Sequence, residues 1–200
     1  PELLTEQDIN RMAAQHKMCP QFHLSLQSGC DATLRRMNRH YDTRAYAAIV
    51  EDLRRHFADC AVTTDIMVGF PGEDEDEFNQ SLGFAEAIGF AKGHVFAYSR
   101  RPGTRAADMP GQVPRAVKEE RSRRMIALTG ASRAAFLADQ VGKTVPVLFE
   151  SRVRDGVYEG YAKNYTPIHL PSQEDLCGQI QQVRITGAGA DWCVGELAQA

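Results

Sequence analysis

The stretch TTDIMVGFPGEDEDEF, residues 63–78, decides the fold of this chain more clearly than any other. An apolar run, Ile66–Val68, ends at the letters GFPG, and five consecutive acidic residues, Glu73–Glu77, follow. This pattern predicts a buried strand over 61–68, a tight turn, and a helix over about 75–88 whose first turn is acidic. Because the two glycines permit positive φ and close backbone approach, the turn is either a structural connection or a ligand-binding loop.

The same strand-to-helix pattern occurs on both sides of this stretch. Alternating apolar and polar residues predict a short strand over 22–26, and apolar residues three and four positions apart predict a helix over 43–57. A third strand is expected over 92–98, and a helix over about 114–138 follows a loop rich in Gly and Pro. Three such repeats predict right-handed βαβ units, so the expected fold class is α/β with parallel strands, half of a barrel.

The pattern changes near residue 141, where the helical period disappears. Short apolar runs separated by Gly and Pro replace it up to the end of the sequence. Several short strands at close spacing predict a small antiparallel β-barrel of roughly 60 residues. We therefore expect two domains, 1–138 and 139–200.

The composition argues against a membrane-spanning protein and against a strongly basic nucleic-acid-binding module. The chain has 200 residues, of which 43% are hydrophobic, and no apolar run approaches the length of a membrane span. Residues 1–138 carry 18 basic and 18 acidic residues and residues 139–200 carry 5 and 8, which account for all 23 and 26 in the chain. This balance is not that of a strongly basic nucleic-acid module. The sequence does not begin with Met, and we expect it to be a piece of a longer protein.

The five cysteines indicate a reducing compartment. They are widely spaced and odd in number, which is typical of a cytoplasmic protein, and no pair has the spacing of a metal site. We therefore predict no metal ligands in this chain and expect each cysteine to be a small buried hydrophobic residue.

Three turns follow the three predicted strands, and ligands of parallel α/β folds bind where strands end. They are 27–29, 69–73 and 98–104. Gln27 can donate and accept hydrogen bonds, as a ribose or an amide requires, or it orders its own loop. Asp65 lies among apolar residues, so it is either a hydrogen-bonded structural acid or part of a site. Arg101 suits a carboxylate or a phosphate, or it is a solvated loop charge.

Three blocks of the sequence together resemble a known family. HLSLQSGCDATLRRMNRHY (23–41), TTDIMVGFPGEDEDEF (63–78) and HVFAYSRRPGTRAADM (94–109) look like consecutive blocks of the radical S-adenosylmethionine (SAM) methylthiotransferases. Residues 139–200, with EGYAKNYTPIHL and LCGQIQQVRITGA, resemble the TRAM domain that ends those enzymes. LSLQSG followed by LRRMNRHY looks most like the branch that modifies threonylcarbamoyladenosine in tRNA.

The resemblance implies a cytoplasmic transferase that adds a methylthio group to C2 of N6-threonylcarbamoyladenosine at position 37, in the anticodon region of tRNA. Its implied cofactors are SAM and [4Fe–4S] clusters. These cofactors carry out the chemistry, and the protein binds and orients them. The family's CxxxCxxC is absent, so its ligands are expected upstream, in a missing N-terminal half, and this chain alone is expected to be inactive. The alternatives are a non-catalytic RNA-binding remnant, or a family member acting on isopentenyl-adenosine tRNA or a ribosomal protein aspartate.

Carried over position by position, the resemblance implies two sets of site residues and no catalytic base. The cofactor-binding set consists of Gln27, Ser28, Asp65, Gly69, Pro71, Gly72, Glu73, Phe96, Tyr98, Ser99 and Arg101. The RNA-binding set consists of Lys143, Arg152, Arg154, Tyr161, Lys163 and Arg184. RNA affinity depends on phosphate neutralisation, so these cations need to gather on one face. Tyr158, Tyr161 and Tyr165 are either base-stacking residues or barrel core.

Overall fold

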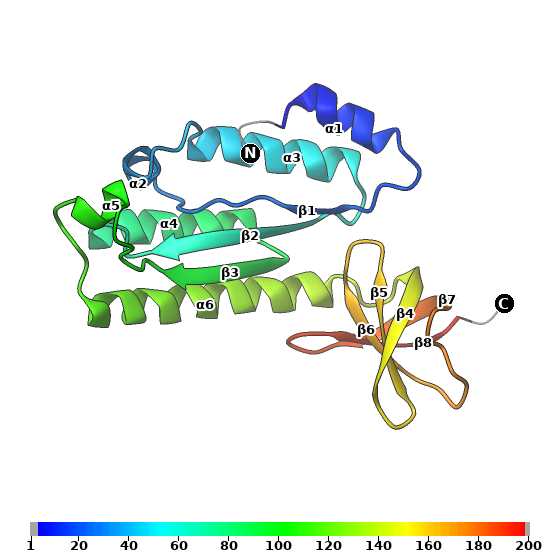
Figure 1. Ribbon diagram of the computed structural model, residues 1–200. Helices are drawn as coiled ribbons and strands as arrows, with labels where there is room; N and C mark the ends of the chain where they lie inside the picture. Colours follow the sequence, from blue (N-terminus) through cyan, green and yellow to red (C-terminus); the bar gives the residue numbers. More distant parts are fainter. Residues whose placement is uncertain (1–3, 199–200) are drawn as a thin grey trace.

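The computed structural model describes residues 4–198, and it consists of an α/β part followed by a closed β-barrel (Figure 1). The helices are α1 (Glu6–Ala13), α2 (Asp31–Arg36), α3 (Thr43–His56), α4 (Glu75–Ile88), α5 (Arg105–Asp108) and α6 (Arg115–Ala138). The strands are β1 (Gln21–His23), β2 (Ala61–Val68), β3 (Lys92–Ala97), β4 (Thr144–Arg154), β5 (Val157–Ala162), β6 (Pro167–Pro171), β7 (Ile180–Ala188) and β8 (Cys193–Leu197).

The α/β part is built on a parallel sheet of order β1-β2-β3, as the strand–helix repeats predict. The first strand is shorter than expected, because the predicted strand over 22–26 leaves the ladder after His23. The Leu26 N–H donates to the hydroxyl of Thr64 (3.0 Å) instead of to a backbone carbonyl. The chain then returns for a single bridge between Gln27 and Ile66.

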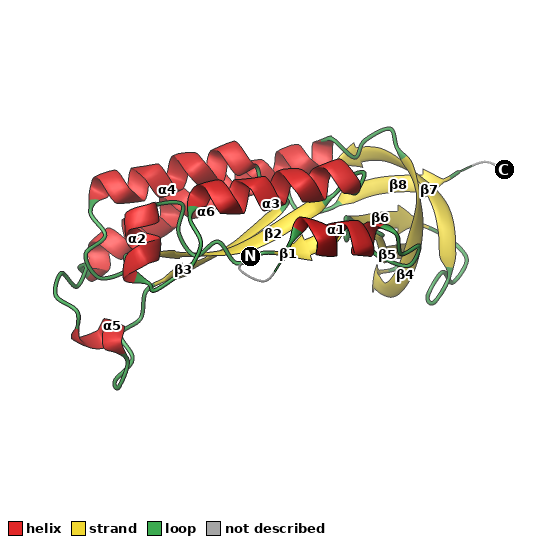
Figure 2. Ribbon diagram, turned by 90° about the horizontal axis from the view of Figure 1, so that it is seen from above, coloured by secondary structure: helices red, strands yellow, loops and turns green. Residues whose placement is uncertain are grey.

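The core of this part lies between the sheet and three long helices. Figure 2 shows α3, α4 and α6 on the same side of the sheet. Tyr46, Phe78 and Phe90 are fully buried there, against Ile66 and its alternate neighbours on β2. The Asp42 side chain caps α3 by accepting the Ala45 N–H (2.7 Å). Helices therefore cover one sheet face, and the opposite face carries the half-buried positions of β2.

The C-terminal barrel closes in the strand order β4-β5-β6-β8-β7. Phe149, Ile168 and Val183 fill it, and Leu137 near the end of α6 belongs to the same buried cluster. The prediction of a wholly antiparallel barrel is wrong at one seam, because β6 and β8 pair in parallel. Tyr158 is core: it is 6% exposed.

The cysteines differ in burial. Cys30 and Cys193 are buried as predicted, but Cys19 and Cys177 are exposed, so a hydrophobic role is wrong for those two. Both lie in connecting segments, where cysteine spacing predicts nothing about burial. Across residues 4–198, we find no helix with the length and apolarity that crossing a membrane requires.

Candidate functional site

Polar side chains occupy the sheet face that the helices leave open. Because side chains alternate along a strand, register partners in parallel strands share a face. His23 is opposite Thr63, Asp65 is opposite His94, and Met67 is opposite Phe96. The open face therefore includes Gln21, His23, Ser25, Thr63, Asp65, Met67, Lys92, His94 and Phe96.

Asp65 is the centre of a hydrogen-bonded group on this face. Its Oδ2 accepts from the Ser25 hydroxyl (3.0 Å) and lies 3.1 Å from Nε2 of His23. The other ring nitrogen of His23 lies 3.0 Å from the Thr63 hydroxyl, and the His94 ring follows at 6.4 Å between centroids. The Asp65 side chain is still 30% exposed, so it is both satisfied within the protein and accessible to a ligand.

The structure brings the three predicted turns together at the carboxyl edge of the sheet. Gln27 exchanges backbone hydrogen bonds with β2, donating to Asp65 and accepting from Met67 (both 2.8 Å). The Tyr98 N–H donates to Val68 (2.9 Å), and its ring meets that of Phe70 at 5.4 Å between centroids. Gln27 has φ +66°, a conformation that non-glycine residues adopt at a cost, and such strained residues tend to cluster at functional sites.

Within the GFPGE turn, most polar groups bind other parts of the protein. Glu73 is 5% exposed; its Oε1 accepts from the Gly69 N–H (2.8 Å) and from Arg121 (2.9 Å). Burial raises the pKa of Glu73, and the Gly69 and Arg121 donors oppose that rise. The Pro71 carbonyl accepts from Nε of Arg36 (3.2 Å).

Gly72, at φ +80°, donates its N–H to the Gly111 carbonyl (2.8 Å). These contacts hold the turn in place, and cofactor contacts of Gly69, Pro71, Gly72 and Glu73 stay a prediction.

The other predicted cofactor residues differ in access. Ser28 is fully buried and its hydroxyl accepts the Cys30 N–H (3.2 Å) at the start of α2, so its cofactor role also stays a prediction. Phe96 is 53% exposed, and Ser99 and Arg101 are exposed beyond it. The Tyr98 hydroxyl is buried and finds no hydrogen-bond partner in the described part of the chain.

The side chains of residues 4–198 do not form a metal centre. Between residues 4 and 198, no group of three or more His, Cys, Asp or Glu side chains is arranged to hold a metal ion. The imidazoles of the open face were missed as site residues, because their sequence spacing shows no ligand pattern. Their alternation with apolar neighbours was the available signal.

The predicted RNA-binding cations lie at two ends of the barrel rather than on one face. Lys143 precedes Thr144, whose register partner is Arg184, and its ammonium lies 2.5 Å from Asp59. Arg152 and Arg154 lie at the other end of β4, which spans 11 residues and is therefore about 30 Å long. Lys163 follows β5 and is exposed, and Tyr161 is half-buried with its hydroxyl 3.1 Å from Glu159. RNA binding by this set stays a prediction.

The comparisons with known proteins agree with this architecture. Residues 1–85 match the model of the Radical SAM superfamily. Coproporphyrinogen III oxidase from Escherichia coli, described as a radical SAM enzyme, superposes with a TM-score of 0.55 at 15% identity, over 82% of this chain and 45% of that one. The expected α/β fold with a parallel sheet, followed by a small closed barrel, is therefore confirmed, and it is similar to the fold of that radical SAM enzyme.

Curated relatives cover nearly the whole chain. The tRNA-2-methylthio-N(6)-dimethylallyladenosine synthases of Caldicellulosiruptor saccharolyticus and Symbiobacterium thermophilum are 35% and 36% identical over 98% and 100% of this chain. The protein of that name from Corynebacterium urealyticum is 38% identical over 94%. The chain spans 42%, 43% and 36% of these three relatives, less than half of each.

Proposed function

Because its first 85 residues match the Radical SAM superfamily, we propose that this chain is part of a radical SAM tRNA methylthiotransferase. We further propose that the enzyme methylthiolates dimethylallyladenosine, also called isopentenyl-adenosine, in tRNA. The support is the identity of 35–38% to three synthases named for that nucleoside. These relatives do not support the threonylcarbamoyl substrate, and the isopentenyl alternative takes its place.

The open sheet face carries this proposal. A carboxylate, an imidazole and a hydroxyl converge at Asp65, and the three turns meet at the end of the same strands. SAM presents an ammonium group, a carboxylate, ribose hydroxyls and a flat adenine, and this mixture needs both polar partners and an apolar surface. Asp65 and Gln27 supply the first kind, and the exposed ring of Phe96 supplies the second.

A buried hydroxyl without a hydrogen-bond partner among the described residues suggests that a ligand binds at this edge of the sheet. Buried polar atoms in proteins are nearly always hydrogen-bonded, yet the Tyr98 hydroxyl is not bonded within residues 4–198. We propose that a group bound beside β3 completes its hydrogen bonding. When bound, SAM and a [4Fe–4S] cluster supply the radical that activates the substrate carbon. The residues of this chain bind and orient, and we propose that cluster ligands come from outside this sequence.

We assign the second domain to RNA. The barrel of β4–β8 is a small closed barrel, an architecture that many nucleic-acid-binding domains share. We propose that it acts as a TRAM-like domain on the anticodon region of tRNA, in the cytoplasm. A non-catalytic RNA-binding remnant stays the second candidate, because no cluster ligands are present among the described residues.

The test is nucleoside analysis of tRNA. The full-length protein is expressed in a strain that lacks tRNA methylthiolation, and the nucleosides are measured by mass spectrometry. Appearance of the methylthio derivative of dimethylallyladenosine supports the proposal, and Asp65→Ala in the same protein should abolish it. The matched control, Asp155→Ala, removes an exposed acid of the β4–β5 hairpin and should leave the yield unchanged. Modification of only the threonylcarbamoyl nucleoside, or of a ribosomal protein aspartate, would contradict the substrate.

If the full-length protein modifies none of these, the remnant is the better explanation.

A further inference from the structure

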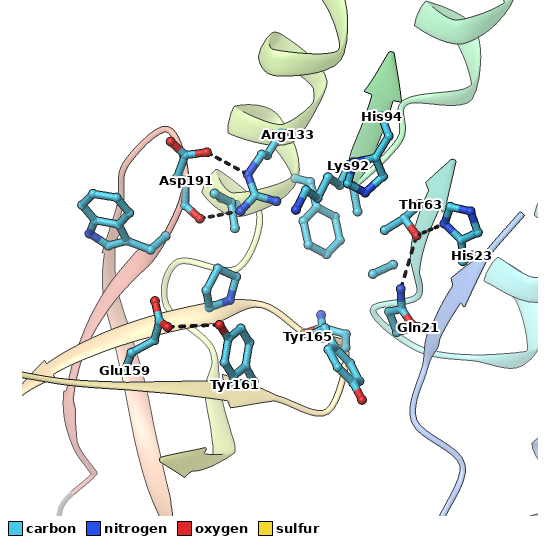
Figure 3. Close-up of a pocket in the computed structure, with 17 residues that line it drawn as sticks. Gln21, His23, Thr63, Lys92, His94, Arg133, Glu159, Tyr161, Tyr165 and Asp191 are labelled. Atoms are coloured by element: carbon cyan, nitrogen blue, oxygen red, sulfur yellow. Dashed lines mark hydrogen bonds and ion pairs between the residues drawn. The ribbon is translucent and has the colours of Figure 1, made fainter. Parts of the chain in front are cut away.

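A cleft separates the sheet from the small barrel, at the end of the sheet opposite the three turns. It has a volume of about 470 Å³. Gln21, Thr63 and Lys92 line it from the amino ends of the three parallel strands, and Arg133 lines it from α6. Figure 3 shows Tyr161 and Tyr165 on the barrel side of the cleft, with the Tyr161 hydroxyl directed toward Glu159.

The barrel side of the cleft is aromatic. The rings of Tyr161 and Tyr165 lie 6.3 Å apart, and Tyr165 is 60% exposed. Trp192, from the β7–β8 connection, is 44% exposed and stacks on His169 at 4.7 Å with an interplanar angle of 22°. One face of the Trp192 indole is thus held by the imidazole of His169, and flat ring surface remains exposed at the cleft.

Tyr165 holds its exposed ring with a strained backbone. Its φ is +60°, in the left-handed region that glycine and asparagine adopt readily and bulky residues rarely do. Its N–H closes the turn by donating to Ala162 (2.9 Å). A turn that keeps a tyrosine where glycine would be unstrained, and leaves the ring in solvent, points to a use for that ring.

The sheet side of the cleft supplies charge and hydrogen-bonding edges. Lys92 is exposed and forms none of the ion pairs found in the described range. Arg133 is already held by Asp191, with Nε 3.3 Å from Oδ1 and Nη2 donating to the backbone carbonyl (2.6 Å). The other acid, Glu159, accepts from Tyr161 (3.1 Å) and lies 2.9 Å from Nε2 of His169. Both carboxylates therefore have partners, and the unpaired charge of Lys92 is positive.

We propose that this cleft binds an unpaired nucleotide of an RNA strand. Aromatic planes hold bases by stacking, a lysine attracts the phosphate, and the amide of Gln21 and the imidazole of His94 face the base edge. The site is composite, since one wall belongs to the sheet and the other to the barrel. It deepens the proposed function, because it gives the tRNA a contact on this chain away from the cofactor turns.

Beyond the tyrosines, the surface offers the proposed RNA strand a second place to bind. Tyr161 and Tyr165 also line a second hollow of about 200 Å³ on the outer face of the barrel. Leu148 and Ile180 line it too; they are cross-strand partners, and Leu148 is also opposite Tyr161. The tyrosine pair therefore separates a polar cleft from an apolar hollow, and two successive bases can stack on its two sides.

The test is RNA binding by this chain without cofactors. Three fluorescent probes are compared: a short RNA hairpin with a single-stranded loop, a fully paired duplex, and adenosine monophosphate. We expect the hairpin to bind more tightly than both others. Tyr165→Asn keeps a residue that tolerates φ +60° and removes the ring, so it should fold normally yet weaken hairpin binding roughly tenfold. Tyr165→Phe, which keeps the ring, should bind like the wild type.

A charge variant tests the phosphate contact. Lys92→Gln should weaken hairpin binding and flatten the plot of log affinity against log salt by about 0.7, the value for one phosphate of a single strand. Arg123→Gln removes an exposed cation that already pairs with Glu120 and should change neither quantity.

Unchanged hairpin affinity in both Tyr165→Asn and Lys92→Gln would overturn the cleft assignment, while nucleoside analysis of the full-length protein would still decide the tRNA substrate. Equal affinity for the duplex would overturn recognition of an unpaired base. Equal affinity for adenosine monophosphate, with the same sensitivity to Tyr165→Asn, would make the cleft a site for free nucleotides and overturn the RNA strand.

Discussion

The carboxylate of Glu73 lies 2.9 Å from Nη1 of Arg121, and the two side chains are 2% and 5% exposed. The same Nη1 donates to the Glu73 backbone carbonyl (3.0 Å). This pair ties the GFPGE turn to α6. Glu73 therefore has a structural role, whereas Asp74, Glu75 and Asp76 are exposed at the start of α4 and Glu77 pairs with Arg36.

Arg121→Met should strongly destabilise the protein. It leaves the Glu73 carboxylate buried without its partner, and breaking a buried pair on one side typically costs about 3–5 kcal/mol. Urea unfolding at neutral pH measures this loss. Arg123→Met, on the exposed side of the same helix, is the control and should change the free energy of unfolding by less than about 0.5 kcal/mol.

The cost of Arg121→Met should shrink at low pH. Burial raises the pKa of Glu73, and removing Arg121 removes one of the opposing effects. A carboxyl whose folded pKa is above its unfolded value stabilises the folded state at low pH, and this contribution is lost as pH rises through the folded pKa. The variant should therefore be closer to the wild type at pH 5 than at pH 8. A pH-independent difference would mean that Glu73 is not the group left unpaired.

Glu77→Gln should weaken the contact between α2 and α4. Nη1 of Arg36 donates to Oε1 of Glu77 (2.8 Å), Nη2 bonds to Oε2, and the Thr33 hydroxyl adds a third bond (3.1 Å). We expect a loss of about 1–2 kcal/mol, since charged hydrogen bonds contribute this much when partly exposed.

Acid should reduce that difference. The Arg36 hydrogen bond lowers the pKa of Glu77, so its stabilisation is present above the ordinary value of 4.5 and is lost as pH falls through the lower folded pKa. Unfolding curves at pH 7 and pH 3 measure this. A gap between Glu77→Gln and wild type that stays constant at pH 3 would exclude the ionised pair as its origin.

Asn164→Ala should loosen the barrel from the α/β part. The Asn164 amide donates to the Asp59 carbonyl (3.1 Å) and to Gln140 (3.2 Å), and its oxygen accepts from the Thr166 hydroxyl (2.7 Å). Because buried acceptors lose their donor, we expect a cost of about 1–3 kcal/mol. Calorimetry should show the barrel transition separating from the rest. Asn79→Ala, an exposed position on α4, is the control.

Cys60 should resist alkylation while Cys19 reacts. Burial raises the pKa of the Cys60 thiol to about 11, so about 0.1% is thiolate at pH 8, and the thiolate is the nucleophile. Cys19 is exposed. Timed iodoacetamide labelling followed by peptide mass spectrometry should show Cys19 modified first, and labelling of Cys60 at a similar rate would contradict the raised pKa of this half-buried thiol.

Local sequence patterns were sufficient to predict most strands and helices of the α/β part. The strand over 61–68 and the helix over 75–88 have the predicted bounds, because both have a regular apolar period and a turn of Gly and Pro between them. The Asp42 cap of α3 was predictable for the same reason, since a cap is a contact between near neighbours. The short β1 was not, because the Thr64 hydroxyl that interrupts its ladder comes from 38 residues away.

The candidate site also has features that local sequence predicts and features that it does not. The sequence placed the three turns at the ends of the three strands, and the parallel sheet brings them together. It could not tell which polar groups of a turn face the interior, because Glu73 receives its partner from a helix 48 residues further along. Nor could it show the cleft between sheet and barrel, whose walls come from residues between Gln21 and Trp192.

By itself, the sequence determined the order of strands and helices, the change to a barrel near residue 141, and the positions of the turns, since all of these follow from periods and turn residues that are local in the chain. Only the tertiary structure decided that Glu73 pairs with Arg121 inside the fold, that Asp65 faces the open side of the sheet, and that Lys92 and Tyr165 line the same cleft. Charge pairing and cavity walls depend on which side chains the fold brings together, and residues far apart in sequence leave no local pattern of their meeting.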